Sequence, residues 1–148
     1  MDITLYDALG GHERIRRLAS AWHAQCLADE VMSHPFSHGG DPHHIERLAA
    51  YWSEQLGGPP LYTTDLGDES FVVRMHAGNG EHAEMDRRAV ACFARALDDV
   101  DVTDAALRDE LIAWFTHETA EMARYPGSPD DVPTGLPMPI WPGRIPSS

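Results

Sequence analysis

The chain has 148 residues, of which 43% are hydrophobic, and a formal net charge of −13 at pH 7. This length fits one domain that encloses a ligand pocket of roughly a few hundred cubic ångströms. Such an acidic chain repels phosphate backbones and anionic lipid surfaces, and no cluster of basic residues interrupts the acidity. Nucleic-acid and membrane-surface partners are therefore disfavoured.

Cysteine usage and the amino terminus indicate the cellular setting. Cys26 and Cys92 are too few and too scattered for a disulfide scaffold or a cysteine-based zinc site, so both are expected to be small core residues. Residues 1–7 carry neither a basic region nor a long apolar region, and no later run of about eighteen apolar residues follows. We expect a soluble, cytoplasmic protein.

The first half of the chain reads as helices separated by glycine and proline. A short apolar turn at residues 5–9 ends at two glycines, and a long helix follows over residues 12–28 with His23 beside its apolar stripe. Residues 29–40 form a corner, where Phe36 is expected to turn inward. Asp41 and Pro42 suit the start of a second helix, which runs from residue 43 to about 56.

Residues 61–70 are polar and are expected to form a surface connection leading to a distinctive stretch, residues 71–80. In this stretch an apolar run ends in His76, and a Gly-x-Gly turn follows. The arrangement suits an imidazole that approaches a large flat ligand while the backbone bends away, as an axial ligand of haem iron does. The alternative is a core histidine whose ring is satisfied by a backbone carbonyl.

The second half contains two more helical patterns and an irregular tail. The first spans residues 81–97, and the second begins after Thr103, expected as its cap, with acidic residues in its first turn. Residues 125–148 hold seven of the eleven prolines and are expected to be extended, either docked in a groove or disordered. Docking would use the apolar side chains Leu136, Met138, Ile140 and Trp141. No strand with clean alternation is found.

Several histidines and apolar residues could share one pocket with His76. His44 and Leu48 are four residues apart and therefore lie on one helix face. A flat cofactor held between His76 on one side and His44, His23, Phe36 and Leu48 on the other accounts for all of these residues together.

The order of these features resembles the truncated haemoglobins, in particular their second group. The matching segments are Leu5-Tyr6-Asp7-Ala8-Leu9-Gly10-Gly11, Ala24-Gln25, Ala28-Asp29-Glu30-Val31, Phe36, Glu46-Arg47-Leu48, Gly57-Gly58-Pro59-Pro60-Leu61-Tyr62 and Arg74-Met75-His76-Ala77. No single segment is specific, but their order and spacing form a strong joint signal over residues 5 to about 123. The proline-rich tail, with Met138-Pro139-Ile140-Trp141, is similar to tails of some actinobacterial members.

The resemblance implies an all-α fold, a truncated globin domain at residues 1–124 followed by the tail at 125–148. It implies a two-over-two helical sandwich around one haem b, with a mostly irregular segment before the proximal iron ligand His76. On the opposite side His44 takes the distal helix position, Leu48 packs one turn on, Phe36 is the corner aromatic, and His23 stands where the family usually has tyrosine.

Two departures from the family pattern affect the expected ligand site. A tryptophan that usually follows the proximal segment is replaced by Ala89, which removes a hydrogen-bond donor and opens space. Ligand stabilisation would then come from His23 and His44. Arg47 and Arg74 are candidates to pair with the haem carboxylates, with ordinary surface arginines as the alternative, and Tyr62 would add a hydroxyl at that edge.

The resemblance implies reversible binding, as in oxygen transport, of oxygen or another diatomic gas such as nitric oxide. The alternative is an enzyme that uses peroxide, oxygen or nitric oxide, of peroxidase or nitric-oxide dioxygenase type, with His44 as the first candidate for general acid or base and His23 beside it. A reductase partner and a homodimer remain open.

Two other classes compete with the globin interpretation. His34, His38, His43 and His44 fall within eleven residues and could form a divalent-metal site, although their spacing matches no common zinc site. The chain could also be a helical interaction module whose working part is the tail. That interpretation does not explain the ordered match through His76.

Overall fold

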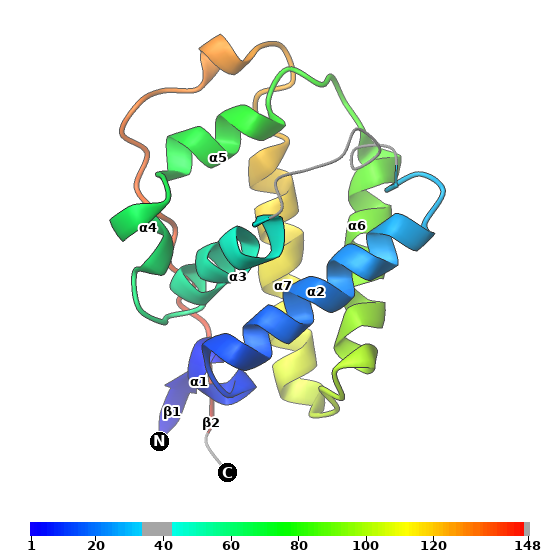
Figure 1. Ribbon diagram of the computed structural model, residues 1–148, viewed down its shortest axis with the longest axis vertical. Coiled ribbons are helices and arrows are strands. Elements are labelled where there is room, and N and C mark those ends of the chain that lie inside the picture. The colour runs from blue at the N-terminus through cyan, green and yellow to red at the C-terminus, as the bar shows by residue number, and fades with distance from the viewer. Residues whose placement is uncertain (34–42, 147–148) are drawn as a thin grey trace.

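The computed structural model describes residues 1–33 and 43–146 and shows a bundle dominated by helices (Figure 1). Its four long helices pack in two pairs, α2 with α3 and α6 with α7. The pairs meet where α2 contacts α6. This is the two-over-two arrangement expected from the sequence. The helices are α1 (Leu5–Leu9), α2 (His12–Ala28), α3 (His44–Gln55), α4 (Leu61–Asp65), α5 (Glu69–His76), α6 (Ala83–Asp99) and α7 (Ala105–Met122).

Side-chain caps fix where several helices begin. Thr4 accepts a hydrogen bond from the backbone of Asp7 at the start of α1, with 3.1 Å between donor and acceptor. The cap of α7 is Asp104, whose carboxylate accepts from the backbone of Leu107 at 2.9 Å. The expected cap at Thr103 was therefore wrong by one residue, and the first turn of α7 holds no acidic residue. The start expected at Asp41 lies outside the described residues.

The segment before His76 is more helical than the sequence suggested. Residues 61–65 form the short helix α4, and α5 covers 69–76, so both the expected surface connection and the expected irregular segment were wrong. Asp68 provides the reason, since its carboxylate caps α5 by accepting from the backbone of Phe71 at 2.8 Å. Glu54 of α3 plays a similar part for α4, accepting from the backbone of Tyr62 at 3.1 Å.

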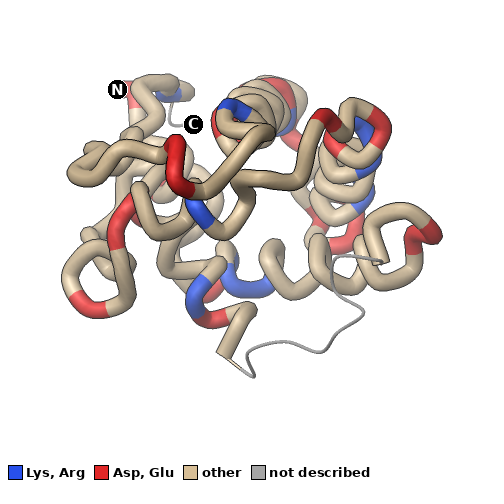
Figure 2. The backbone as a smooth tube through the Cα atoms, turned by 90° about the horizontal axis from the view of Figure 1, so that it is seen from above, with Lys and Arg blue, Asp and Glu red and all other residues tan. Residues whose placement is uncertain are grey.

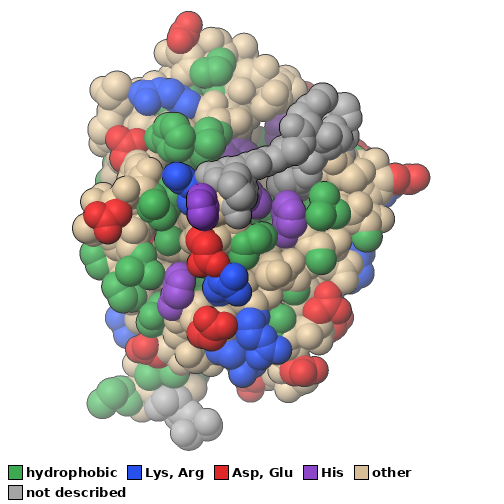
Figure 3. Space-filling model, in the orientation of Figure 1, with side chains coloured by type: hydrophobic (Ala, Val, Ile, Leu, Met, Phe, Trp, Pro, Cys, Tyr) green, Lys and Arg blue, Asp and Glu red, His purple; other side chains and the backbone are tan. Residues whose placement is uncertain are grey.

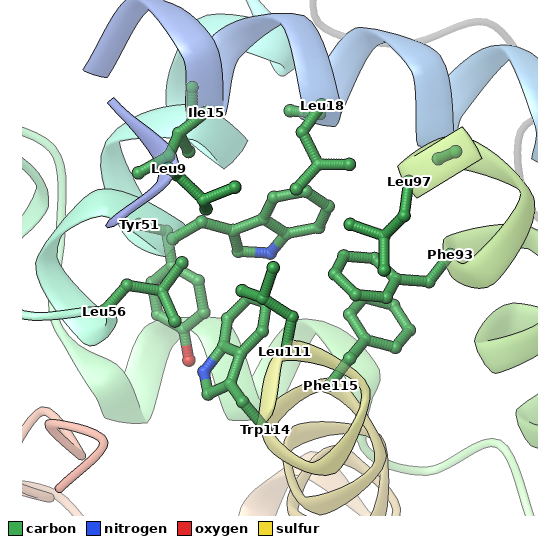
Figure 4. Packing of buried hydrophobic residues seen from close by; sticks show 14 of the residues in the cluster. Leu9, Ile15, Leu18, Tyr51, Leu56, Phe93, Leu97, Leu111, Trp114 and Phe115 are labelled. Atoms are coloured by element: carbon green, nitrogen blue, oxygen red, sulfur yellow. The ribbon is translucent and has the colours of Figure 1, made fainter. Parts of the chain in front are cut away.

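Aromatic rings fill the space between the two helix pairs. Phe93 of α6 stacks on Phe115 of α7, with ring centroids 4.3 Å apart and planes 9° from parallel. Trp52 of α3 meets both rings edge-on, and Figure 4 shows Phe93, Phe115 and Trp114 converging below α2. We call Trp22, Trp52, Phe93, Trp114 and Phe115 the aromatic cluster. The two cysteines lie fully buried in the same core, as expected.

The proline-rich tail docks on the helices rather than extending away from them. Strand β2 (Arg144–Pro146) pairs antiparallel with β1 (Asp2–Thr4), and a 3-10 helix, η2, spans Pro129–Asp131. The backbone of Trp141 donates to the Gln55 carbonyl at 2.8 Å, and its indole N–H donates to Glu110 at 3.0 Å. Leu136 and Met138 also pack inward, whereas Ile140 is 54% exposed, so its expected docking was wrong.

Acidic residues are distributed along the described chain, with arginines interspersed among them (Figure 2). Within residues 1–33 and 43–146, none of the helices has the length and apolar character needed to cross a membrane.

Candidate functional site

Histidine side chains gather on the face of the molecule that lies beside the segment drawn in grey (Figure 3). They come from different elements, since His23 lies on α2, His44 begins α3, and His76 ends α5. Of these three, His23 and His44 contact each other through their rings, although they are 21 positions apart in the sequence.

His76 is held by its own helix. Its Nδ1 lies 2.8 Å from the Val72 carbonyl oxygen, one turn earlier in α5. A carbonyl oxygen only accepts, so Nδ1 carries the proton and the neutral ring presents the lone pair of Nε2. A backbone carbonyl satisfies the ring, as in the core-histidine interpretation, but His76 keeps solvent-accessible surface and is not enclosed in the core. One ring nitrogen is fixed while the other is a candidate donor to a metal.

The surroundings of His76 favour the neutral imidazole. His76 is an exposed residue, but desolvation by neighbouring protein atoms lowers its pKa, while the hydrogen bond to the Val72 carbonyl opposes the shift. A nearby His82 lowers the pKa of His76 further when it is charged, and His82 itself contacts Asp86 at 2.8 Å. A neutral imidazole is the form that binds metals.

The glycine turn after His76 anchors the end of α5 to the tail. Gly78 has a φ of 77°, and a Cβ at this position would lie 2.8 Å from Cδ of Pro129. Its N–H donates to the Tyr125 carbonyl at 2.9 Å, and the N–H of Gly80 donates to Pro126 at 2.9 Å. The turn thus fixes where His76 sits.

The two other candidate histidines are neighbours. The ring centroids of His23 and His44 are 5.1 Å apart, with planes inclined by 54°. Burial lowers the pKa of His23, so a neutral ring is favoured there too. The structure thus joins α2 and α3 through a pair of imidazoles, which can donate or accept a proton.

Arg47 and Leu48 lie on α3, the helix that begins at His44, and Tyr62 lies on α4. Leu48 packs against the edge of the core. Burial raises the pKa of Tyr62, and the charge of Arg47 opposes that rise, which places the guanidinium close to the phenol. Tyr62 is only 3% exposed, and its ring meets the ring of Tyr51 edge-on, with 5.3 Å between the centroids, so the Tyr62 ring is part of the packed interior. Arg74 is half-buried on α5.

Ala89, the residue expected to replace the family's tryptophan, is buried on α6. Its carbonyl accepts a hydrogen bond from the indole N–H of Trp22 at 3.1 Å. An indole from α2 therefore lies against this position, and its N–H is directed at the backbone.

Three of the predicted residues lie outside the described residues, namely Phe36 and the histidines at 34 and 38. In the part of the chain that is described, no group of three or more His, Cys, Asp or Glu side chains is arranged to hold a metal ion.

Sequence reasoning missed a set of buried polar residues at contacts that α3 makes with α5 and α7. Glu69 starts α5 seven residues before His76, and two full helical turns place both on related faces. That spacing could have identified Glu69 had the segment been recognised as helix. Its hydroxyl partner Tyr51 and the second buried carboxyl, Glu118, come from other helices and carried no signal.

Comparisons with known proteins agree with this geometry. A family profile described as bacterial-like globin matches residues 4–124. A comparison with curated proteins finds no match. Among solved structures, the group II truncated haemoglobin from Bacillus anthracis is 20% identical, with a TM-score of 0.73 over 91% of this chain and 98% of that chain.

Two further solved structures have the same fold. A thermostable haemoglobin from the actinobacterium Thermobifida fusca is 26% identical, with a TM-score of 0.67 over 90% of this chain and 100% of its own. A truncated oxygen-avid haemoglobin from Bacillus subtilis is 20% identical, with a TM-score of 0.67 over 81% of this chain and 98% of its own. The truncated globin fold expected from the sequence is confirmed.

Proposed function

Because the chain belongs to the bacterial-like globin family, we propose that it binds haem b between α3 and α5, with His76 as the proximal ligand, and holds a small diatomic gas. A bound haem would supply an iron that Nε2 of His76 could hold and that could bind a gas molecule reversibly. The Thermobifida fusca neighbour is a haemoglobin, which supports this choice of cofactor.

The bond between Nδ1 of His76 and the Val72 carbonyl carries the proposal. A histidine that ligates a metal generally donates its other ring N–H to a carbonyl or carboxylate, which fixes the tautomer and the ring orientation. His76 meets this condition at 2.8 Å, and its lowered pKa favours the neutral ring. The donor set therefore fits a haem iron.

The remaining residues are assigned by their place in the fold. His23 and His44 face the gas and donate a hydrogen bond to it, worth on the order of 1–3 kcal/mol. Leu48 gives an apolar wall, and Ala89 leaves room beside Trp22. Arg47 and Arg74, with the Tyr62 hydroxyl, neutralise the haem carboxylates.

Titration with haemin tests the proposal. The native protein is expected to develop an intense Soret band at one haemin per chain, and His76→Ala is expected to lose or strongly shift that band. His117→Ala is the matched control, since His117 is an exposed histidine of α7. Native protein that takes up no haemin refutes the proposal.

A catalytic use of peroxide is the second candidate, and the His23–His44 pair favours it. Two imidazoles in contact, one of them with a lowered pKa, provide a neutral base that can take a proton from peroxide and return it to the departing oxygen. Comparing His44→Leu with the native protein separates the two. A gas carrier shows an oxygen off-rate raised by about 10- to 100-fold, whereas a catalyst loses peroxide turnover.

A further inference from the structure

Two buried carboxyl side chains lie at contacts that α3 makes with α5 and α7. Glu69 of α5 is 5% exposed and Glu118 of α7 is 8% exposed. Both contact α3, because Tyr51 donates its hydroxyl to Glu69 at 2.6 Å and Gln55 donates its amide to Glu118 at 2.9 Å. We call Tyr51, Gln55, Glu69 and Glu118 the carboxyl network. It ties the helix that carries His76 to the helix that begins at His44.

The network is one connected unit. Tyr51 and Gln55 are four residues apart on α3 and so face the same side one turn from each other. The Gln55 side chain also accepts from the Trp114 indole at 3.2 Å, so its amide is oriented from two sides. The two carboxyls are therefore connected through one turn of α3, from Tyr51 to Gln55, so a change in the protonation of one affects the other.

Negative charges act on both carboxyls, and Glu121, which acts on each of them, is ion-paired with Arg124 at 3.1 Å. Glu118 and Glu121 of α7 and Asp68 at the start of α5 act on Glu69, and Glu121 acts on Glu118. Asp130 and Asp131 of η2, which packs against α5, are exposed. Burial is the main cause that raises the pKa of each carboxyl to about 7, while the bonds from Tyr51 and Gln55 oppose it.

We propose that the carboxyl network is a proton-linked latch that sets the position of His76: with the carboxyls protonated it holds α5 against α3 and α7, and ionisation of both loosens α5. Two buried carboxylates that act on each other repel and attract water. α5 is a short helix, and movement away from α3 and α7 would relieve this repulsion. The consequence for haem rests on the proposed function, whereas the latch itself does not.

The latch is tested first by unfolding the full chain without haem in urea between pH 4 and 9. The native protein is expected to lose stability as the pH rises towards about 7 and to level off above it. Replacing both carboxyls, in Glu69→Gln with Glu118→Gln, keeps the acceptors and is expected to flatten this profile. Glu13→Gln, which removes one exposed charge from α2, is the control and is expected to keep the native profile.

Tyr51→Phe gives a second, directional test. The Tyr51 hydroxyl favours the ionised form of Glu69, so its removal is expected to move the stability transition to higher pH. A transition that persists unchanged in the double glutamine variant overturns the latch, and so does a shift to lower pH in Tyr51→Phe.

The position of His76 is read from the iron–histidine stretching frequency of the ferrous haem protein by resonance Raman spectroscopy. The native frequency is expected to change near pH 7, and the double glutamine variant is expected to hold the acidic value throughout. If the iron–histidine frequency does not change with pH while the free energy of unfolding does, the link between the latch and His76 is refuted. If no haem binds, the proposed function fails and the positioning role fails with it, but the unfolding profiles still decide the latch.

Discussion

The aromatic cluster and the carboxyl network use the same two helices and have opposite characters. On one side of α3 and α7, Trp52 and Phe115 meet other rings in a dry core. On the same two helices, Tyr51 and Glu118 carry buried polar groups, and burial raises the pKa of Glu118 to about 7. Trp114 belongs to both, since its ring packs on Phe93 and its N–H bonds to Gln55. The first region supplies stability, and the second adjusts the helix that presents His76.

The largest expected effect breaks the aromatic cluster. Phe93→Ala removes a fully buried ring stacked on Phe115 and leaves a cavity, which should lower the free energy of unfolding by about 3–5 kcal/mol. Urea denaturation at pH 5 measures the change. Leu27→Ala is the control, because Leu27 is 50% exposed and its loss should cost little. If Phe93→Ala and Leu27→Ala lower the free energy of unfolding equally, the aromatic cluster is not the stabilising region.

An intermediate effect is expected from neutralising the carboxyl network. The pKa of Glu69 and of Glu118 is raised from 4.5 to about 7 in the folded protein. Between these two pH values the folded protein therefore binds more protons than the unfolded chain. Stability is therefore full at pH 4 and lost as the pH rises through 7. At pH 8 the double glutamine variant should be more stable than native by on the order of 1–3 kcal/mol, with little difference at pH 4. A stabilisation that is the same at both pH values would contradict this assignment.

The smallest expected effect is at the cap of α5. Asp68→Ala removes the acceptor for the Phe71 N–H and should cost about 1 kcal/mol. Asp68→Asn removes the same charge but keeps a capping oxygen, so it isolates the hydrogen bond. Thermal unfolding of the two variants at pH 6 measures the difference. If Asp68→Asn is as unstable as Asp68→Ala, charge and not capping holds the start of α5.

The long helices could be predicted from sequence because each carries a strong local pattern. The helix expected over residues 12–28 matches α2, since a broad apolar stripe and a preceding glycine pair define it without help from the rest of the chain. The segment around α4 and α5 could not, because its helices are only 5 and 8 residues long. They are held by caps from Asp68 and from Glu54, the latter on another helix.

The same distinction applies to the site. His76 stood out in sequence because an apolar run delivers it to a glycine turn, and the structure gives it the carbonyl partner that a metal ligand needs. The contact between His23 and His44 depends on how α2 crosses α3 and could be anticipated only through the family resemblance. Glu118 lies 49 positions after Glu69 and meets its network only in the folded chain, so local pattern gave no indication of it.

The ligation of haem by His76 is tested most directly by removing the imidazole and returning it from solution. His76→Gly should bind haemin weakly and without the native Soret band, and adding free imidazole at millimolar concentration should restore a native-like spectrum. The native protein should be unaffected by the same addition. A His76→Gly variant that binds haemin with the native spectrum before imidazole is added would contradict the assignment of His76 as the iron ligand.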